Sequence, residues 1–414
     1  MAEPIKLESL EERVILVGIS LQDERETEES LDELQELADT AGARTVGKMI
    51  QKRESVHPGL YLGTGKIAEL REMIEETGAT GIICDDELSP AQLRNLEQEL
   101  DSKVMDRTLL ILDIFAARAA TSEGKIQVEL AQLQYRLARL VGLRSSLSRL
   151  GGGIGTRGPG EKKLEMDRRL VKSRIAQLRR ELQDVKRHRD VIRERRKKNR
   201  VPVAAIVGYT NAGKSTLLNT LTEADVLEED KLFATLDPTT RTLVLEGGQE
   251  ILLTDTVGFI RKLPHHLIEA FRSTLEEAKY ADVILHVVDA SNPQMEKQMH
   301  VVYDTLETLG VQGKTIVTLF NKQDRLEEPV SMRDFRADRV LGISARTGQG
   351  LEEVKTLLEE ILTERQILIE RLYPYEEAGK IQLIRKFGQL LTEEYREDGI
   401  YVKAYVPQEI YGNV

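Results

Sequence analysis

Residues 208–215 read Gly-Tyr-Thr-Asn-Ala-Gly-Lys-Ser, which is the spacing of a loop that binds phosphate groups. The apolar run at 203–207 precedes the loop and a helical pattern follows it, as this motif requires. Glycines allow backbone N–H groups to approach phosphate oxygens, Lys214 can reach the β- and γ-phosphates, and the Ser215 hydroxyl can face Mg²⁺. The segment therefore predicts a nucleoside triphosphate site.

Three later segments complete this site. We expect Asp255, in Asp-Thr-Val-Gly, to hold magnesium through water, and the N–H of Gly258 to meet the γ-phosphate. Asp324, in Asn-Lys-Gln-Asp, can accept both the ring N–H and the exocyclic NH₂ of guanine, whereas adenine would leave this carboxylate unpaired. The loop 344–346, Ser-Ala-Arg, fits a donor of backbone N–H to guanine O6. These segments predict GTP rather than ATP.

The segment 233–241, Phe-Ala-Thr-Leu-Asp-Pro-Thr-Thr-Arg, has the position of a nucleotide switch. We favour Thr235 as the threonine whose hydroxyl joins Mg²⁺ only while the γ-phosphate is present. Thr239 and Thr240 are alternatives, because threonines beside proline also cap turns.

The candidate residues fall into catalytic, metal-binding and nucleotide-binding groups. The catalytic candidates are Lys214, Thr235 and Gly258, and the metal candidates are Ser215, Thr235 and Asp255. The candidates for nucleotide contact are Gly208, Tyr209, Thr210, Asn211, Ala212, Gly213, Lys214, Ser215, Thr216, Phe233, Ala234, Thr235, Leu236, Asp237, Asp255, Thr256, Val257, Gly258, Asn321, Lys322, Gln323, Asp324, Ser344, Ala345 and Arg346.

Phe259 follows Asp-Thr-Val-Gly where GTPases often carry a glutamine that orients the attacking water. A phenyl ring cannot orient water by a hydrogen bond. Either the protein binds GTP without turnover, or something else completes the site. Because the other motifs are intact, and one well-placed cation can supply about 10³–10⁵ in rate, we favour slow hydrolysis that a partner stimulates.

Composition limits the class of protein. The chain has 414 residues, 40% hydrophobic and 31% charged, which predicts a globular protein of several domains. The acidic start is unlike a secretory signal and no apolar run is long enough for a membrane span, so we expect a cytosolic protein. Cys84 is the only cysteine, which excludes an internal disulfide and favours a buried apolar role for this residue.

Charge is distributed unevenly along the chain. The net charge is −11, yet residues 157–200 hold 18 Lys and Arg against 7 Asp and Glu. This segment is suited to an anion, and our hypothesis is the phosphate backbone of RNA, with a solvated helix face as the alternative. The candidate residues are Arg144, Arg149, Arg157, Lys162, Lys163, Arg168, Arg169, Lys172 and Arg174.

The pattern of apolar residues predicts a multidomain α/β protein. In 1–122, strands near 14–19, 44–50 and 81–84 alternate with helices near 26–41, near 66–77 and from 89, which indicates an α/β domain. In 123–200, apolar residues recur at steps of three and four on both sides of a glycine-rich loop, which predicts a helical hairpin. The first stretch of this seam holds Ile126, Leu130, Leu133, Leu137 and Leu140, and the second holds Leu164, Val171, Ile175, Leu178, Leu182, Val185 and Ile192.

The remaining residues predict two further domains. Residues 201–365 form a doubly wound sheet with the phosphate loop, in which 242–256 can form a hairpin. Residues 366–414 predict a small α+β domain, with a helix across 376–391 between two strands.

With these motifs together, the chain resembles the HflX family of bacterial and archaeal GTPases. The resemblance runs nearly end to end and is most specific in Gly-Gly-Gly-Ile-Gly-Thr-Arg-Gly-Pro-Gly-Glu and Asp-Thr-Val-Gly-Phe-Ile. It implies association with the large ribosomal subunit, separation of ribosomal subunits under stress, and GTP hydrolysis that ends the bound state. It also makes a hydrophobic residue at Phe259 expected. Related GTPases suggest Asn211 as a ligand for K⁺ over the phosphates.

Some signals and alternatives stay open. Residues 59–66, Gly-Leu-Tyr-Leu-Gly-Thr-Gly-Lys, resemble a second phosphate loop, but the spacing is one residue too long and Ile67 replaces the Ser or Thr. His265 and His266 can relay a proton or merely begin a helix. We expect a monomer. The functional alternatives are an RNA-binding pseudo-GTPase scaffold and an assembly factor for the large subunit.

Overall fold

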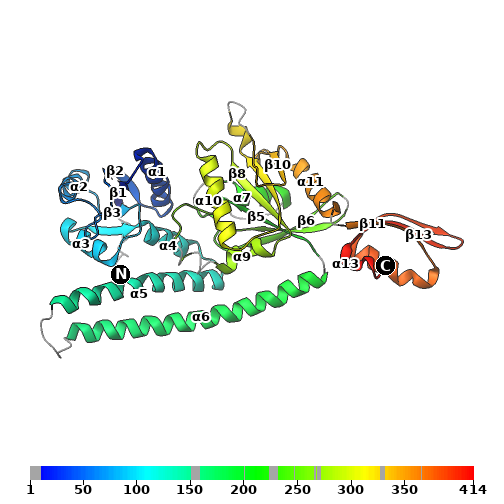
Figure 1. Cartoon of the computed structure of the whole chain (residues 1–414), viewed down its shortest axis with the longest axis horizontal. Coiled ribbons are helices and arrows are strands. Elements are labelled where there is room, and N and C mark those ends of the chain that lie inside the picture. The colour runs from blue at the N-terminus through cyan, green and yellow to red at the C-terminus, as the bar shows by residue number, and fades with distance from the viewer. Residues whose placement is uncertain are drawn as a thin grey trace, which may run out of the picture. The chain divides into compact units, whose positions relative to one another are not determined.

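The computed structural model describes residues 11–150, 159–199, 201–222, 232–246, 248–264, 267, 272–326, 332–364 and 366–414. The chain divides into two compact units, each of which is described by itself (Figure 1). Unit 1 holds Met1–Val185, Asp230–Leu236 and Lys262–Arg272, and unit 2 holds Lys186–Glu229, Asp237–Arg261 and Ser273–Val414. No helix among the described residues is both long and apolar enough to cross a membrane.

Unit 1 contains a four-stranded parallel sheet in the order β2-β1-β3-β4. Its strands are β1 (Arg13–Ser20), β2 (Arg44–Lys52), β3 (Gly81–Cys84) and β4 (Lys103–Asp106), and its helices are α1 (Glu24–Thr40), α2 (Thr64–Thr77), α3 (Pro90–Leu100) and α4 (Arg107–Arg118). β1 is buried along nearly its whole length, as its continuous apolar run predicts for a parallel strand covered on both faces. The sequence did not predict β4 and α4, which follow one another without an intervening turn.

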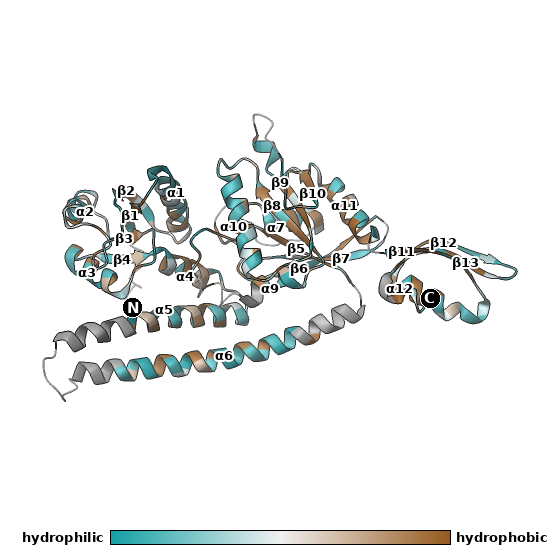
Figure 2. Ribbon diagram, in the orientation of Figure 1, coloured by the Kyte–Doolittle hydropathy of each residue, from teal (hydrophilic) through white to brown (hydrophobic). Residues whose placement is uncertain are grey.

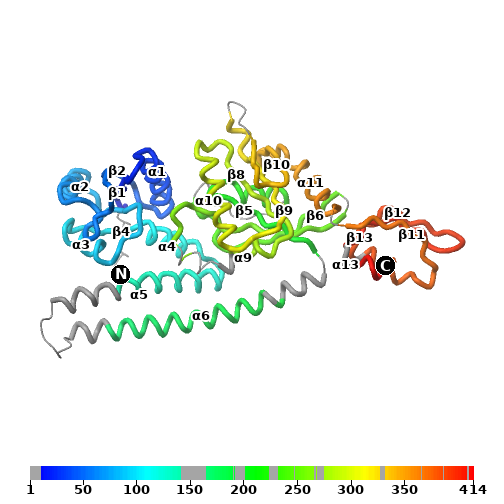
Figure 3. Tube along the Cα trace, viewed as in Figure 1, coloured from blue at the N-terminus to red at the C-terminus, as the bar shows by residue number. Residues whose placement is uncertain are grey.

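Two long helices of the same chain, α5 (Ser122–Leu150) and α6 (Pro159–Asn199), form the hairpin (Figure 3). Leu130, Ile175 and Leu178 form its buried core, and Ile126, Leu133, Leu137, Val171 and Leu182 pack against it. These are predicted seam positions, and the seam is thus confirmed there. The side chains of Leu164 and Ile192 lie outside the described part of the structure.

Unit 2 contains a six-stranded sheet in the order β10-β9-β8-β5-β7-β6, whose strands are mostly hydrophobic (Figure 2). Only β6 is antiparallel, and it forms the expected hairpin with β7. The strands are β5 (Val203–Gly208), β6 (Thr239–Val244), β7 (Glu250–Asp255), β8 (Val283–Asp289), β9 (Thr315–Asn321) and β10 (Arg339–Gly342). The helices are α7 (Lys214–Thr222), α9 (Arg272–Tyr280), α10 (Met295–Thr308) and α11 (Leu351–Glu364), with a 3₁₀ turn at Gln323–Arg325. The multidomain α/β class with a phosphate-loop sheet is confirmed.

The last segment is an antiparallel three-stranded sheet, β11-β13-β12, with helix α12 (Ala378–Phe387). Its strands are β11 (Gln366–Tyr373), β12 (Gln389–Arg396) and β13 (Gly399–Pro407), followed by α13 (Gln408–Tyr411). The predicted helix across 376–391 is wrong at both ends: Tyr375–Glu377 is a 3₁₀ turn, and β12 follows α12. The helix ends before Gly388, whose backbone is extended, and a side chain does not fit there because a Cβ would come 2.5 Å from the carbonyl oxygen of Tyr405.

Candidate functional site

The phosphate loop joins the end of β5 to the start of α7, as the motif predicts. Asn211 and Gly213 have positive φ angles of 61° and 94°, which Asn and Gly tolerate better than other residues. A side chain at residue 213 would also collide with Asn321, since a Cβ there would lie 2.3 Å from Asn321 Nδ2. The loop conformation therefore depends on the glycines that the sequence supplies.

Lys214 and Ser215 face the centre of the loop. Lys214 is buried, and its ammonium group donates to the backbone oxygen of Tyr209 at 2.7 Å. Ser215 Oγ donates to Asp255 Oδ2 at 2.8 Å, although 40 residues separate them in the chain. A hydroxyl and a carboxylate are hard oxygen donors of the kind that Mg²⁺ takes, so this pair fits the predicted metal site.

Burial lowers the pKa of Lys214 to about 8; Asp255 opposes that shift and Lys322 adds to it. Since this pKa is below that of an unfolded lysine, the contribution of Lys214 to the free energy of unfolding rises as pH increases from about 8 to about 10.5.

Phosphate oxygens favour the charged form of Lys214, and we therefore expect the protein to take up roughly half a proton when it binds GDP at pH 8. Calorimetry in two buffers of different ionisation enthalpy measures this uptake.

The control for this prediction is Lys214→Arg, because a guanidinium stays charged at pH 8 and has no proton to gain. Equal proton uptake by the variant and the parent protein would assign the effect to another group.

The segment Asp-Thr-Val-Gly-Phe runs beside the phosphate loop and is joined to it by backbone hydrogen bonds. Thr210 N donates to Phe259 O at 2.8 Å, and Phe259 N donates to Gly208 O at 3.1 Å. Gly258 is so close to the loop that a Cβ would lie 3.0 Å from Lys214 Nζ. The predicted partners Lys214 and Gly258 are thus brought together.

Phe259 is buried, with 1% of its surface exposed. Its ring is therefore part of the packing of unit 2, and its backbone is the part that makes hydrogen bonds to the phosphate loop.

We expect Phe259→Gln to lower the free energy of unfolding by about 2–4 kcal/mol, which urea titration measures as a lower midpoint. Basal GTP hydrolysis should not rise. The amide would replace a buried ring and lose its hydrogen bonds to water. Phe259→Leu is the control and should lose less, because it stays apolar. A faster, stable Gln variant would show that residue 259 can orient water.

The predicted base-reading turn is tied to the phosphate loop through Asn321. Asn321 Nδ2 donates to Ala212 O at 2.8 Å, and Asn321 Oδ1 accepts from Ala345 N at 2.9 Å. Ser344 Oγ donates to Asp324 Oδ1 at 2.6 Å, and this hydrogen bond lowers the pKa of Asp324. Asp324 is therefore an ionised acceptor at neutral pH, as recognition of guanine requires. Lys322 and Gln323 lie in the base-reading turn, and Thr256 follows Asp255 in the segment beside the phosphate loop.

The switch candidates fall in both units. Phe233–Leu236 belongs to unit 1, where the ring of Phe233 meets that of Phe115 edge-on with centroids 4.7 Å apart, whereas Asp237 and the phosphate loop belong to unit 2. The structure thus does not bring Thr235 and Ser215 into one unit, and the role of Thr235 stays a prediction. Thr240, an alternative, lies in β6 with its hydroxyl 3.0 Å from that of Thr254.

Several backbone N–H groups of the loop at 59–66 donate hydrogen bonds to side chains of unit 1. Gly59 N and Leu60 N both donate to His57 Nδ1, and Gly63 N donates to Gln51 Oε1 at 2.8 Å. These amides hold the loop together, so the geometry gives no support to a second phosphate site. His265 and His266 lie outside the described residues.

The candidates for RNA contact are described only in part. Arg157 and the side chains of Arg144, Arg149, Lys162 and Lys163 lie outside the described residues. Arg169 and Lys172 are exposed on α6, and Arg168 is half-buried. Arg174 instead makes two hydrogen bonds with Glu129 of α5, at 2.7 and 2.9 Å, and is the weakest candidate for a phosphate contact.

Two polar contacts of this region were not predicted. The Tyr209 hydroxyl accepts from Arg261 N at 2.9 Å, which adds a side-chain role to a residue chosen for its backbone. Lys262 pairs with Asp85 and Asp86 within unit 1. No motif marks these contacts, because each joins segments far apart in the sequence.

Three family models match successive parts of the chain. They are described as GTP-binding GTPase N-terminal (residues 28–116), GTP-binding GTPase Middle Region (118–196) and 50S ribosome-binding GTPase (203–322).

Related proteins match over most of the chain. GTPase HflX of Lacrimispora saccharolytica is 69% identical over 414 residues, covering 100% of this chain and 98% of that protein. GTPase HflX of Escherichia coli is 45% identical over 356 residues, covering 85% and 83%. The crystal structure of a GTP-binding protein from Sulfolobus solfataricus with GDP is 26% identical, with a TM-score of 0.45, covering 85% of this chain and 99% of that one.

Proposed function

The chain belongs to the HflX family of GTPases, and from that premise we propose that it binds the large ribosomal subunit and separates ribosomal subunits under stress. GTP hydrolysis, the activity of the family, ends the bound state in this proposal. The family model at 203–322, with its description as a 50S ribosome-binding GTPase, supports the choice of partner. Cytosolic location and a monomeric state are part of the proposal.

One observation carries the proposal of a ribosome-stimulated enzyme. The phosphate loop, the Ser215–Asp255 pair and the base-reading turn form a connected site, yet a buried phenyl group stands where a water-orienting side chain is common. Hydrolysis of this kind depends mostly on positioning and electrostatics, which a partner can supply. The free protein should accordingly be slow and the ribosome-bound protein fast.

The proposal also assigns roles to the site residues. In this proposal Ser215 and, on loading with GTP, Thr235 would hold Mg²⁺, with Asp255 acting through water, and the ion would neutralise phosphate charge. Lys214 and the amides of the loop bind the phosphates, and Asp324 reads guanine. Asn211 holds K⁺ near the phosphates, and equal rates in sodium and potassium would dismiss that ion.

The basic helix α6 and the glycine-rich segment before it contact ribosomal RNA in this proposal. Arg169 and Lys172, which are exposed on α6, pair with phosphates in this proposal. Binding to large subunits should then weaken steeply between low and moderate salt, because each phosphate contact releases counterions. A flat response would remove the phosphate contacts from the proposal.

Purified large subunits should raise the rate of phosphate release from GTP at least a hundredfold, since a single added charge can be worth about 10³–10⁵. Single-turnover assays with and without subunits measure the effect, and small subunits alone serve as the control. Sedimentation of intact ribosomes with the protein and GTP then tests separation. Stimulation without separation would favour a role in assembly, and no stimulation would contradict the proposal.

A further inference from the structure

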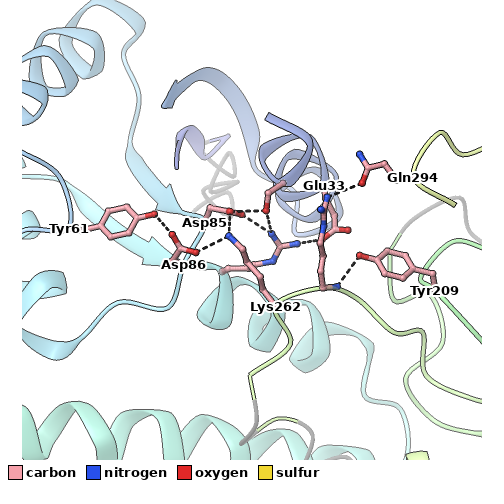
Figure 4. A network of polar contacts seen from close by, with 10 residues as sticks. Glu33, Tyr61, Asp85, Asp86, Tyr209, Lys262 and Gln294 are labelled. Atoms are coloured by element: carbon pink, nitrogen blue, oxygen red, sulfur yellow. Dashed lines mark hydrogen bonds and ion pairs between the residues drawn. The ribbon is translucent and has the colours of Figure 1, made fainter. Parts of the chain in front are cut away.

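The side chain of Lys262, four residues after Gly258, ends on two adjacent carboxylates of unit 1 (Figure 4). Lys262 Nζ donates to Asp86 Oδ1 at 2.8 Å and also to Asp85 Oδ2. Asp85 and Asp86 directly follow β3, at the carboxyl edge of the parallel sheet. Open α/β sheets bind ligands at this edge, and in this sheet the Lys262 side chain makes ion pairs there.

The two carboxylates are held in place by other contacts. The Asp85 side chain is only 1% exposed and accepts from Ser30 Oγ and Arg107 Nη1, each at 2.7 Å. Asp86 accepts from the hydroxyl of Tyr61 at 2.8 Å. Lys262 therefore binds a rigid acceptor rather than a pair of mobile surface groups.

The backbone of Lys262 is also unusual. Its φ angle of 54° is disfavoured for lysine and better suited to Asn or Gly. The preceding residue, Arg261, is the last of its segment in unit 2, where its N–H donates to the Tyr209 hydroxyl. Lys262 is thus the first residue at which the segment after Gly258 belongs to unit 1.

We propose that Lys262 is a positioning residue for GTP hydrolysis, which anchors the end of segment 255–262 on Asp85 and Asp86. The other end of this segment is fixed by β7, and its middle by the hydrogen bonds of Phe259 to the phosphate loop. Anchoring the end restricts the backbone at Gly258, whose N–H must meet the γ-phosphate, and such restriction favours the reactive geometry. The inference rests on the GTPase activity of the family and not on the proposed role at the ribosome.

Lys262→Asn tests the anchor, because Asn removes the ammonium group and tolerates positive φ. We expect kcat for basal GTP hydrolysis to fall at least fivefold while KM for GTP changes less than twofold. Lys262→Arg, which keeps the charge, should recover at least half of the parent rate. Lys380→Asn is the control, since it breaks an exposed ion pair with Glu377 within the C-terminal segment and should leave kcat unchanged.

A double-mutant cycle with Asp86→Asn identifies the partner. If the two residues act through one contact, Lys262→Asn with Asp86→Asn should lose no more activity than Lys262→Asn alone. Amide exchange at 256–261 should become faster in both single variants while the thermal midpoint of unfolding stays within about 2 °C of the parent. An unchanged or raised kcat in Lys262→Asn, additive losses, or an Arg variant as slow as the Asn variant would overturn the proposal.

Discussion

Asp324→Asn is expected to lower the affinity for GTP and GDP at least a hundredfold and to raise the affinity for xanthosine nucleotides. The carboxylate accepts two N–H donors of guanine, and hydrogen bonds to a charged group contribute about 1.5–3 kcal/mol each. The side chain of asparagine has one acceptor oxygen and one NH₂ group. The NH₂ group would face one of the two N–H groups of guanine, and two donors cannot form a hydrogen bond with each other. Xanthine carries a carbonyl in place of the exocyclic amine, so the new donor would there find an acceptor.

The hydrogen bond that Asp324 accepts supports this expectation, because it holds the carboxylate in its ionised form. The Ser344 hydroxyl holds one carboxylate oxygen at 2.6 Å and thereby lowers the pKa of Asp324. Competition titrations with GDP and xanthosine diphosphate measure the exchange of specificity. Asp398→Asn, which removes an exposed carboxylate in the turn between β12 and β13, is the matched control. If Asp324→Asn still preferred guanine by the same margin, another residue would read the base.

Gly258→Ala is expected to reduce GTP hydrolysis at least a hundredfold. A Cβ at this position would lie 2.8 Å from Thr210 Cγ2, 2.9 Å from Thr210 Cα and 3.0 Å from Lys214 Nζ. Because Thr210 Cα belongs to the backbone of the phosphate loop, a rotamer change cannot relieve the contact. The segment or the loop must shift, and both carry groups that must meet the γ-phosphate.

Single-turnover phosphate release measures the loss. Gly379→Ala, in α12, adds the same methyl group where no atom lies within 4 Å, and it should keep the parent rate. Guanine recognition at Asp324 should survive in Gly258→Ala, so GDP should still bind. Hydrolysis at the parent rate by this variant would show that the close approach of residue 258 to the loop is dispensable.

The sequence predicts an element of the fold where the residues that define it are close together in the chain. The phosphate loop, the carboxylate at the end of β7 and the turn after β9 were found because each uses adjacent residues with fixed types. The seam of the hairpin was found because its apolar residues repeat with the period of a helix. β4 and β12 were missed, since β4 runs directly into α4 without an intervening turn and burial does not alternate along β12.

The sequence by itself therefore determined the class of ligand and predicted the residues that bind it, because phosphate and guanine are recognised by short runs of backbone and side chain. Only the tertiary structure decided what Phe259 and Lys262 do. Phe259 is buried, and its backbone pairs with the phosphate loop some 50 residues earlier in the chain. The Lys262 ammonium meets Asp85 across 177 residues. Contacts of this kind depend on how distant segments pack, and no local pattern of residues encodes them.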